Sequence, residues 1–265
     1  MITTGLYQTV TDLITDIADT EILTRFHALT DTDITRKHGG DLVTTADRQT
    51  ERRLSQALRD LLPGSVTVGE ESVADNPDLL RHLTTDTPAW IIDPVDGTTN
   101  FVNGDTDYCC LVSLSTHDTV HASWIYAPSQ HLTAGAHTGH GAWINGRPVT
   151  LPTPTTDNLN LVTTHPNYTA RYRQLVTRLT RRHWTTTPCR TAGLSYVDVA
   201  AGLHDAVVYT WQHPWDHAAG LHLLTTIGGT SRTGDGTPFR ISGGNRLPFV
   251  AGHPTTVDIV TAAIG

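Results

Sequence analysis

The stretch Asp93-Pro94-Val95-Asp96-Gly97-Thr98-Thr99-Asn100 directly follows the apolar run Trp90-Ile91-Ile92. The apolar run is typical of a buried strand, so two carboxylates come close together where that strand ends. Carboxylates in such proximity repel one another unless a positive charge lies between them, and hard divalent cations prefer oxygen ligands. The glycine and hydroxyl residues that follow place backbone N–H groups beside this position, which suits a phosphate. The octet therefore indicates metal-assisted phosphoryl chemistry.

The composition of the chain limits the classes of protein to consider. Its 265 residues are enough for one large domain or two closely packed halves, and 38% are hydrophobic. A net charge of −8 argues against a general nucleic-acid or anionic-membrane binder. The sequence contains no apolar run of about 18 residues, so we predict no membrane span. The N-terminus lacks the features of a signal peptide. The three cysteines form neither an even disulfide framework nor a metal-ligand spacing. We expect a cytoplasmic, disulfide-free enzyme with no nucleic-acid or membrane partner.

The first part of the chain predicts helices followed by a β-rich region. Apolar residues recur at three- and four-residue steps over 6–17, which favours an amphipathic helix. A second helix is expected from Thr45 to Leu61, where Pro63-Gly64 ends it, and a short strand over 65–68. Short β-rich runs separated by turn formers over 109–146 predict an antiparallel meander.

The segment from Leu151 to Asn158 is the best candidate for a junction between two halves, 1–150 and 151–265. Beyond it, strands are expected near Leu161, over 206–209 and near Phe249. Helices are expected over 172–179, from Ser195, after Trp215, and at the end of the chain near Ile264. This alternation favours helices layered on sheets.

Four stretches bring acidic residues to the ends of strands or the starts of helices. They are Asp41-Leu42-Val43-Thr44-Thr45-Ala46-Asp47, Gly69-Glu70-Glu71-Ser72, the octet, and Trp215-Asp216 with the glycine pair Gly228-Gly229 beyond. Taken singly, Asp47 and Asp216 could simply favour a helix N-terminus and Glu70-Glu71 could be a solvated loop. All four together, in this order and spacing, resemble the inositol monophosphatase family of metal-dependent phosphomonoesterases over nearly the whole chain.

The resemblance implies a layered αβαβα sandwich, with the active site between an α+β first half and an α/β second half. It also implies two Mg²⁺ ions and room for a third beside Glu70. One ion would be held by Glu70, Asp93 and the carbonyl of Val95, and the other by Asp93, Asp96 and Asp216.

The resemblance further implies metal-activated water attack on phosphorus. Thr98 and Asp47 would orient and deprotonate the water, with Glu70 also counted among the catalytic residues. The backbone N–H groups of Gly97 and Thr98 would bind the phosphate of the substrate, and Asp96 would also contact the substrate. Lys37 would lie on a mobile loop over the metals, although Arg36 could take that place.

The alcohol side of the substrate is less well defined. Leu194 and Ser195 match the region that lines it, so we expect both to touch substrate. Tyr209 stands where inositol-specialised members carry a glutamate for ring hydroxyls. Either this tyrosine enters the pocket, where its ring would suit imidazole or adenine, or it packs against Trp211. His222 is a second departure from the family pattern, as either a satisfied buried histidine or part of a subunit contact.

Two other patterns compete for chemistry. Asp31-Thr32-Asp33-Ile34-Thr35 fits the nucleophile pattern of haloacid dehalogenase phosphatases, but it lacks an apolar strand ahead of it. His213 and His217 have zinc-like spacing, but Pro214 lies between them. We interpret neither pattern as functional.

The leading hypothesis is therefore a Mg²⁺-dependent phosphomonoesterase for inositol 1-phosphate or a similar polyol phosphate, and a homodimer as its relatives commonly are. Its rivals are a histidinol-phosphate phosphatase or a 3′(2′),5′-bisphosphate nucleotidase of the same family. A non-catalytic regulatory partner is disfavoured because every expected metal ligand is present.

Overall fold

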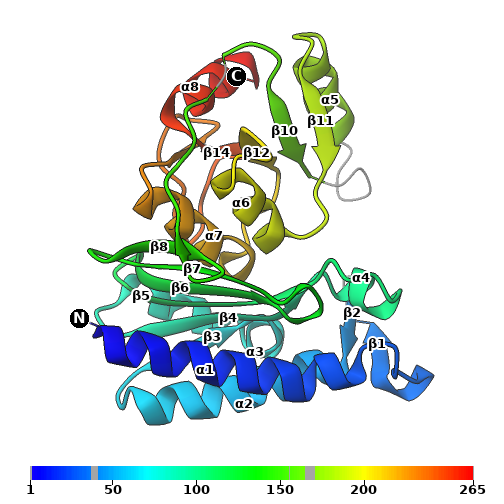
Figure 1. Ribbon diagram of the computed structural model, residues 1–265, viewed down its shortest axis with the longest axis vertical. Coiled ribbons are helices and arrows are strands. Elements are labelled where there is room, and N and C mark those ends of the chain that lie inside the picture. Colours follow the sequence, from blue (N-terminus) through cyan, green and yellow to red (C-terminus); the bar gives the residue numbers. More distant parts are fainter. Residues whose placement is uncertain (1, 37–40, 155, 165–170, 265) are drawn as a thin grey trace.

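The computed structural model describes residues 2–36, 41–154, 156–164 and 171–264. Within this part of the chain, the strands form two large sheets and one small pair, and helices separate and cover the sheets (Figure 1). The helices are α1 (Thr4–Glu21), α2 (Thr45–Leu61), α3 (Glu70–Asp75), α4 (Thr98–Val102), α5 (Arg171–Thr180), α6 (Ala192–Ala200), α7 (Pro214–Thr226) and α8 (Pro254–Ile264).

The first large sheet has the strand order β3-β4-β5-β6-β7-β8-β9. Only the β3–β4 pairing is parallel, and the others are antiparallel as the predicted meander requires. The strands are β3 (Val66–Gly69), β4 (Ala89–Asp96), β5 (Cys109–Thr116), β6 (Thr119–Ala127), β7 (Leu132–His137), β8 (Gly141–Ile144) and β9 (Arg147–Pro148).

The second large sheet has the order β11-β10-β12-β14-β13, and β1 (Ile34–Arg36) pairs with β2 (Leu42–Thr44) in the small one. The strands of the second sheet are β10 (Asn160–Thr163), β11 (Thr185–Pro188), β12 (Ala206–Tyr209), β13 (Thr230–Thr233) and β14 (Phe249–Gly252). The expected strands near Leu161 and Phe249 and over 206–209 are thus present, whereas β11 and β13 were not predicted.

The layers run in the order helices, sheet, helices, sheet, helices. In Figure 1, α1 and α2 cover the outer face of the seven-stranded sheet, α6 and α7 lie between the two sheets, and α5 and α8 cover the far face of the five-stranded sheet. The predicted αβαβα sandwich is therefore confirmed. The division into 1–150 and 151–265 stays a prediction, although the segment between β9 and β10 does separate the strands of the two sheets.

Local sequence signals explain where the site-bearing helices begin. Thr44 caps α2 by accepting hydrogen bonds from the N–H groups of Ala46 and Asp47, and Asp47 returns a bond to the Thr44 N–H. Thr191 caps α6 through the N–H of Leu194, at 3.2 Å. Because of this cap, α6 begins at Ala192 and not at Ser195, which corrects the expectation from sequence.

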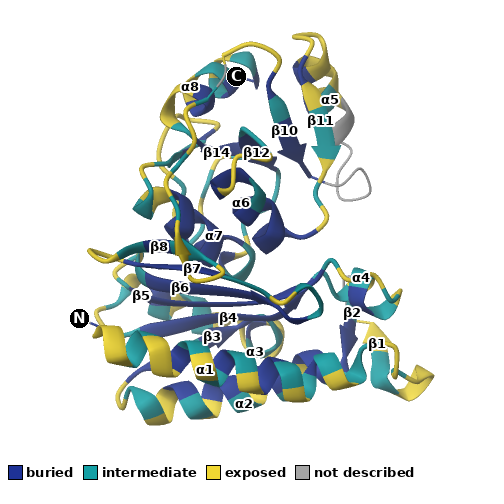
Figure 2. Ribbon diagram, viewed as in Figure 1, coloured by how far each residue is buried: buried dark blue, intermediate teal, exposed yellow. Residues whose placement is uncertain are grey.

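Strand β4 and the inner helices are among the most buried parts of the molecule. Every residue of β4 is buried, and α7 is buried along most of its length between the two sheets (Figure 2). His222 of α7 is a satisfied buried histidine, because its ring nitrogens lie 2.9 Å from Ser123 Oγ and 3.0 Å from Thr138 Oγ1. No helix in the described ranges is long and apolar enough to span a bilayer.

Candidate active site

Four carboxylates from three elements gather at the carboxyl end of β4. Glu70 is the first residue of α3, Asp93 and Asp96 end β4, and Asp216 lies in the first turn of α7. The pairing of β4 with β5 is irregular between Asp93 and Asp96, so the strand changes register at the predicted turn. The structure therefore brings together the acidic residues that the sequence separates by up to 146 positions.

The electrostatics of this cluster are unfavourable without a cation. Burial raises the pKa of Asp93 well above its usual value, and the charges of Glu70, Asp96 and Asp216 raise it further. Burial and the charge of Asp216 raise the pKa of Asp96 to about 7, although three hydrogen bonds oppose the shift. Like charges forced together in a buried place favour protonation or a bound cation.

Two of the carboxylates are held by the layers around them. Asp96 Oδ2 accepts a hydrogen bond from the Gly193 N–H at 2.7 Å, and Asp96 Oδ1 accepts one from the Ala192 N–H at 3.3 Å. Asp216 Oδ2 accepts a hydrogen bond from the indole Nε1 of Trp211 at 2.5 Å. Burial would raise the pKa of Asp216, but the interaction with His213 and nearby histidine charge lower it overall.

The donor set fits a divalent metal ion. Asp93 is 1% exposed, and its Oδ1 has no hydrogen-bond partner among the described residues. A buried carboxylate oxygen without a donor is costly unless a ligand completes it. Within those same residues, no three His, Cys, Asp or Glu side chains already converge in a metal-holding arrangement. Asp96 and Asp216 accept hydrogen bonds from Gly193 and Trp211, so these protein donors orient them away from a shared centre.

A threonine and an aspartate lie beside the acidic cluster at hydrogen-bond distance. Thr98 Oγ1 is 3.1 Å from Asp47 Oδ1 and 3.0 Å from the carbonyl oxygen of Val95. The other carboxylate oxygen of Asp47 accepts hydrogen bonds from the N–H and hydroxyl of Thr44, at 2.7 Å and 2.6 Å. Asp47 therefore caps α2 and contacts Thr98 at the same time, so its role as a helix cap leaves room for the catalytic role, which stays a prediction.

Gly97 permits the chain to turn between Asp96 and Thr98. Its φ of +93° lies in the left-handed region, which favours glycine. A Cβ at this position would lie 2.5 Å from Thr191 Cγ2 and 2.9 Å from the carbonyl oxygen of Asp107. Both conformation and space therefore exclude a side chain where the phosphate is expected.

The residues predicted on the alcohol side are buried beneath the site. Leu194 and Ser195 lie in the first turn of α6, where Ser195 Oγ donates to the Thr191 carbonyl at 2.6 Å. Tyr209 is 0% exposed, and its ring centroid lies 4.3 Å from that of Trp211. Its hydroxyl lies 3.4 Å from Cys189 Sγ. Of the two interpretations of Tyr209, packing against Trp211 is the one that these contacts support.

The remaining sequence candidates contribute no carboxylate to the cluster. Lys37 lies outside the described residues, and Arg36 lies at the exposed end of β1. His213 borders the cluster, with its Nδ1 3.6 Å from Asp216 Oδ2. His217 is buried, with ring nitrogens 3.1 Å from the Tyr196 hydroxyl and 3.2 Å from the Trp211 carbonyl. Asp31–Asp33 form a 3₁₀ turn closed by Asp33 and Thr30.

The roles of two residues at the site were not predicted from the sequence. The sequence predicts Trp211 only as a packing partner of Tyr209, because a hydrogen bond to Asp216 leaves no mark in it. Glu51 is the other: its buried carboxylate contacts the start of α3. An acidic residue four positions after Asp47, on the inner face of an amphipathic helix, was the available signal.

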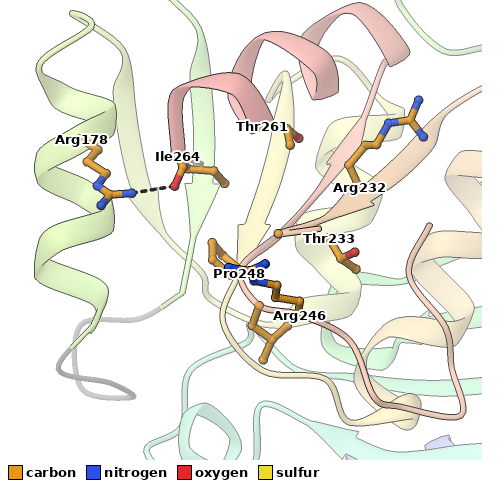
Figure 3. A pocket seen from close by; sticks show the side chains of 9 residues that line it. Arg178, Arg232, Thr233, Arg246, Pro248, Thr261 and Ile264 are labelled. Atoms are coloured by element: carbon orange, nitrogen blue, oxygen red, sulfur yellow. Dashed lines mark hydrogen bonds between the residues drawn. The ribbon is translucent and has the colours of Figure 1, made fainter. Parts of the chain in front are cut away.

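A separate cavity of about 240 Å³ lies in the second sheet layer, and its lining includes three arginines, Arg178, Arg232 and Arg246 (Figure 3). Arg178 donates to the carbonyl of Ile264 at 2.7 Å, as the dashed line in Figure 3 shows, and Arg232 lies 3.6 Å from Asp258. None of the four acidic residues lines this cavity.

Known proteins resemble the chain in sequence and in fold. The inositol-1-monophosphatase of Bacillus subtilis (strain 168) is 28% identical over 225 residues, which are 83% of this chain and 82% of that protein. The fructose-1,6-bisphosphatase/inositol-1-monophosphatase of Thermotoga maritima is 30% identical over 196 residues, 71% of this chain and 70% of that protein. A solved Thermotoga maritima IMPase structure matches with a TM-score of 0.84 at 23% identity, covering 99% of this chain and 97% of that one.

Together these relatives define the class, which is that of the phosphoric monoester hydrolases. The model of the inositol monophosphatase family matches residues 4–258. The chain belongs to the inositol monophosphatase family.

Proposed function

We propose that the protein is a Mg²⁺-dependent phosphomonoesterase whose substrate is inositol 1-phosphate or a similar small polyol phosphate. The environment of Asp93 is the observation that carries this proposal. Asp93 is buried and lies near Glu70, Asp96 and Asp216, and one of its oxygens has no hydrogen-bond donor among the residues that the structure describes. A divalent cation would neutralise the clustered negative charge and would also bind the Asp93 oxygen that lacks a donor.

The proposed metal ligands are those that the family resemblance implies, and the four carboxylates lie close enough to interact electrostatically. Glu70, Asp93 and the carbonyl of Val95 would hold one ion, and Asp93, Asp96 and Asp216 a second. A third ion beside Glu70 belongs to the same proposal. When bound, Mg²⁺ would neutralise these carboxylates and stabilise charge on the entering and leaving oxygens of the phosphoryl group.

The residues of the chain would orient the reactants and move the proton. Thr98, at 3.1 Å from Asp47, would orient the attacking water, and Asp47 would accept the proton through the Thr98 hydroxyl. Gly97 and Thr98 begin a helix beside the cluster, and their N–H groups would bind the phosphate. Asp96 would contact the substrate in addition to a metal ion.

A second candidate substrate class follows from β12. Tyr209 occupies the position where a carboxylate would bind ring hydroxyls, and it packs against Trp211, which is bonded to Asp216. Half-buried Trp211, and not the fully buried Tyr209, would offer the aromatic face that favours a substrate with a planar ring, such as histidinol phosphate or a 3′-phosphorylated nucleotide. Leu194, Ser195 and Tyr209 stay predicted substrate residues.

A substrate panel at fixed Mg²⁺ tests both candidates. We expect hydrolysis only with Mg²⁺ present, and the highest kcat/KM on inositol 1-phosphate. A higher kcat/KM on histidinol phosphate or on a nucleotide 3′-phosphate would move the assignment to the second class. Inactivity toward every small phosphomonoester would overturn the catalytic proposal and favour a regulatory role. The homodimer and the cytoplasmic location stay predictions.

A further inference from the structure

Glu51 joins the two elements that carry Asp47 and Glu70. It lies one helical turn after Asp47 on α2, and it is 5% exposed. Its Oε2 accepts a hydrogen bond from the Glu71 N–H at 2.7 Å, and its Oε1 accepts one from the Ser72 N–H at 2.8 Å. The Ser72 hydroxyl donates to the same Oε1. Glu51 thus binds the first turn of α3 with both carboxylate oxygens.

The carboxylate of Glu51 stands where the capping side chain of α3 would normally be. The N-cap residue of α3 is Gly69, which makes no side-chain capping bond of its own. A Cβ at Gly69 would lie 2.3 Å from the Glu51 carboxyl carbon and 2.4 Å from its Oε1. Glycine at 69 therefore leaves the space that the Glu51 carboxylate fills. The N–H groups at the start of α3 are satisfied from α2, 20 residues earlier in the chain.

This arrangement fixes the backbone from which the side chain of Glu70 departs. Glu70 lies between Gly69, which is packed against Glu51, and Glu71, whose N–H is bonded to Glu51. Both carboxylate oxygens of Glu51 accept hydrogen bonds, whereas Asp93 Oδ1 has no partner among the described residues. The two acids therefore have different roles. Outer residues that orient metal ligands commonly affect metal affinity strongly.

We infer that Glu51 is a positioning residue, which holds α3 against α2 so that Glu70 presents its carboxylate to a divalent cation. The inference rests on the proposed function, because it concerns the cation site on the Glu70 side. It predicts weaker cation binding when any of the three hydrogen bonds between Glu51 and α3 is lost, with the larger effect for a backbone bond, while Thr98 and Asp47 remain in place.

The test uses Glu51→Gln in the full chain. Glutamine matches glutamate in size, but its amide nitrogen cannot accept an N–H, so one backbone donor loses its partner. Asp60→Asn is the matched control, because Asp60 lies on the same helix and its carboxylate contacts only exposed Gln56 in the described structure. Both variants are stripped with EDTA, dialysed, and titrated with Mg²⁺ in a calorimeter. Turnover is then measured as a function of Mg²⁺ concentration.

We expect Glu51→Gln to weaken Mg²⁺ binding by about 10- to 100-fold, while Asp60→Asn binds like the wild type. Turnover of Glu51→Gln at saturating Mg²⁺ should return to within a few-fold of the wild-type value. Reduced thermal stability with unchanged Mg²⁺ affinity would overturn the inference, because it would show a purely structural role.

A second variant covers the case in which Glu51→Gln does not fold. Ser72→Ala removes one donor to Glu51 and leaves its charge and both backbone bonds. We expect Ser72→Ala to weaken Mg²⁺ binding as well, but by less than Glu51→Gln. A Mg²⁺ affinity equal to that of the wild type would contradict the inference. A wild-type protein that neither binds Mg²⁺ nor hydrolyses phosphomonoesters would instead refute the proposed function, so the two failures are distinguishable.

Discussion

Glu51 and Asp93 are both buried carboxylates, yet their surroundings are opposite. Glu51 accepts three hydrogen bonds, from two N–H groups and one hydroxyl of α3. Asp93 faces three other carboxylates, and its Oδ1 has no donor in the described residues. The first group is completed by the protein itself. The second is destabilising until a cation arrives, so burial alone does not distinguish a structural acid from a functional one.

The largest expected effect comes from Asp93→Asn. It should reduce Mg²⁺-dependent phosphatase activity by about 10³-fold or more, because metal ions contribute several kcal/mol to such reactions and each 1.4 kcal/mol is a factor of ten. Without metal, the variant should melt at a higher temperature than the wild type, because asparagine removes the negative charge that the neighbouring carboxylates repel. Glu51→Gln should melt at a lower temperature. Calorimetric scans in EDTA compare the two, and a shift in the same direction for both would remove the contrast between these acids.

Thr98→Ala should be the next largest effect. Loss of the hydroxyl between Asp47 and Val95 should lower kcat by about 10²-fold, the lower end of what a proton-transfer group contributes. Mg²⁺ affinity should change little. Thr98→Ser restores the hydroxyl and should recover most of the activity, and Thr99→Ala, on the exposed side of α4, is the control. Equal kcat in the Thr98 and Thr99 alanine variants would exclude Thr98 from the reaction.

Trp211→Phe should have a smaller effect on the same site. Phenylalanine keeps an aromatic ring against Tyr209 but loses the N–H that donates to Asp216 at 2.5 Å. We expect about tenfold weaker Mg²⁺ binding, as for other residues that orient a metal ligand. Isothermal titration measures it. An unchanged affinity would mean that Asp216 needs no support from Trp211 to bind Mg²⁺.

The smallest effect should be the pH dependence of metal-free stability. The pKa of Asp93 is raised on folding, so the folded state binds more protons and this group lowers stability as pH rises above about 4. His217 and His222 act in the opposite direction between pH 6.5 and about 4, because burial lowers the pKa of each to about 4. The difference between wild type and Asp93→Asn removes the histidine contribution. In EDTA that difference should grow toward neutral pH, and Mg²⁺ should abolish it.

Local patterns predicted much of the fold, and long-range contacts explain what they missed. The start of α2 at Thr45 follows from its capping box. The meander follows from short β-rich runs that turn-forming residues separate. The 3.1 Å contact between Thr98 and Asp47 was expected from the family resemblance alone. The Ala192 and Gly193 N–H groups on Asp96 were not expected, because they come from a helix 96 residues away. Periodicity could not decide whether Tyr209 faces a pocket or a packed layer, since both orientations exist on one strand.

Two glycines set how closely the first sheet approaches α6. A Cβ at Gly193 would lie 2.5 Å from Leu111 Cδ2 and 2.7 Å from Cys109 Sγ, and one at Gly97 would lie 2.5 Å from Thr191 Cγ2. Each glycine thus meets atoms of the opposite layer. In a library of single substitutions selected for activity, positions 97 and 193 should accept almost no replacement. A larger residue at either position would need a compensating change in the layer that it faces, so the width of the active site can change only slowly in evolution at these two positions.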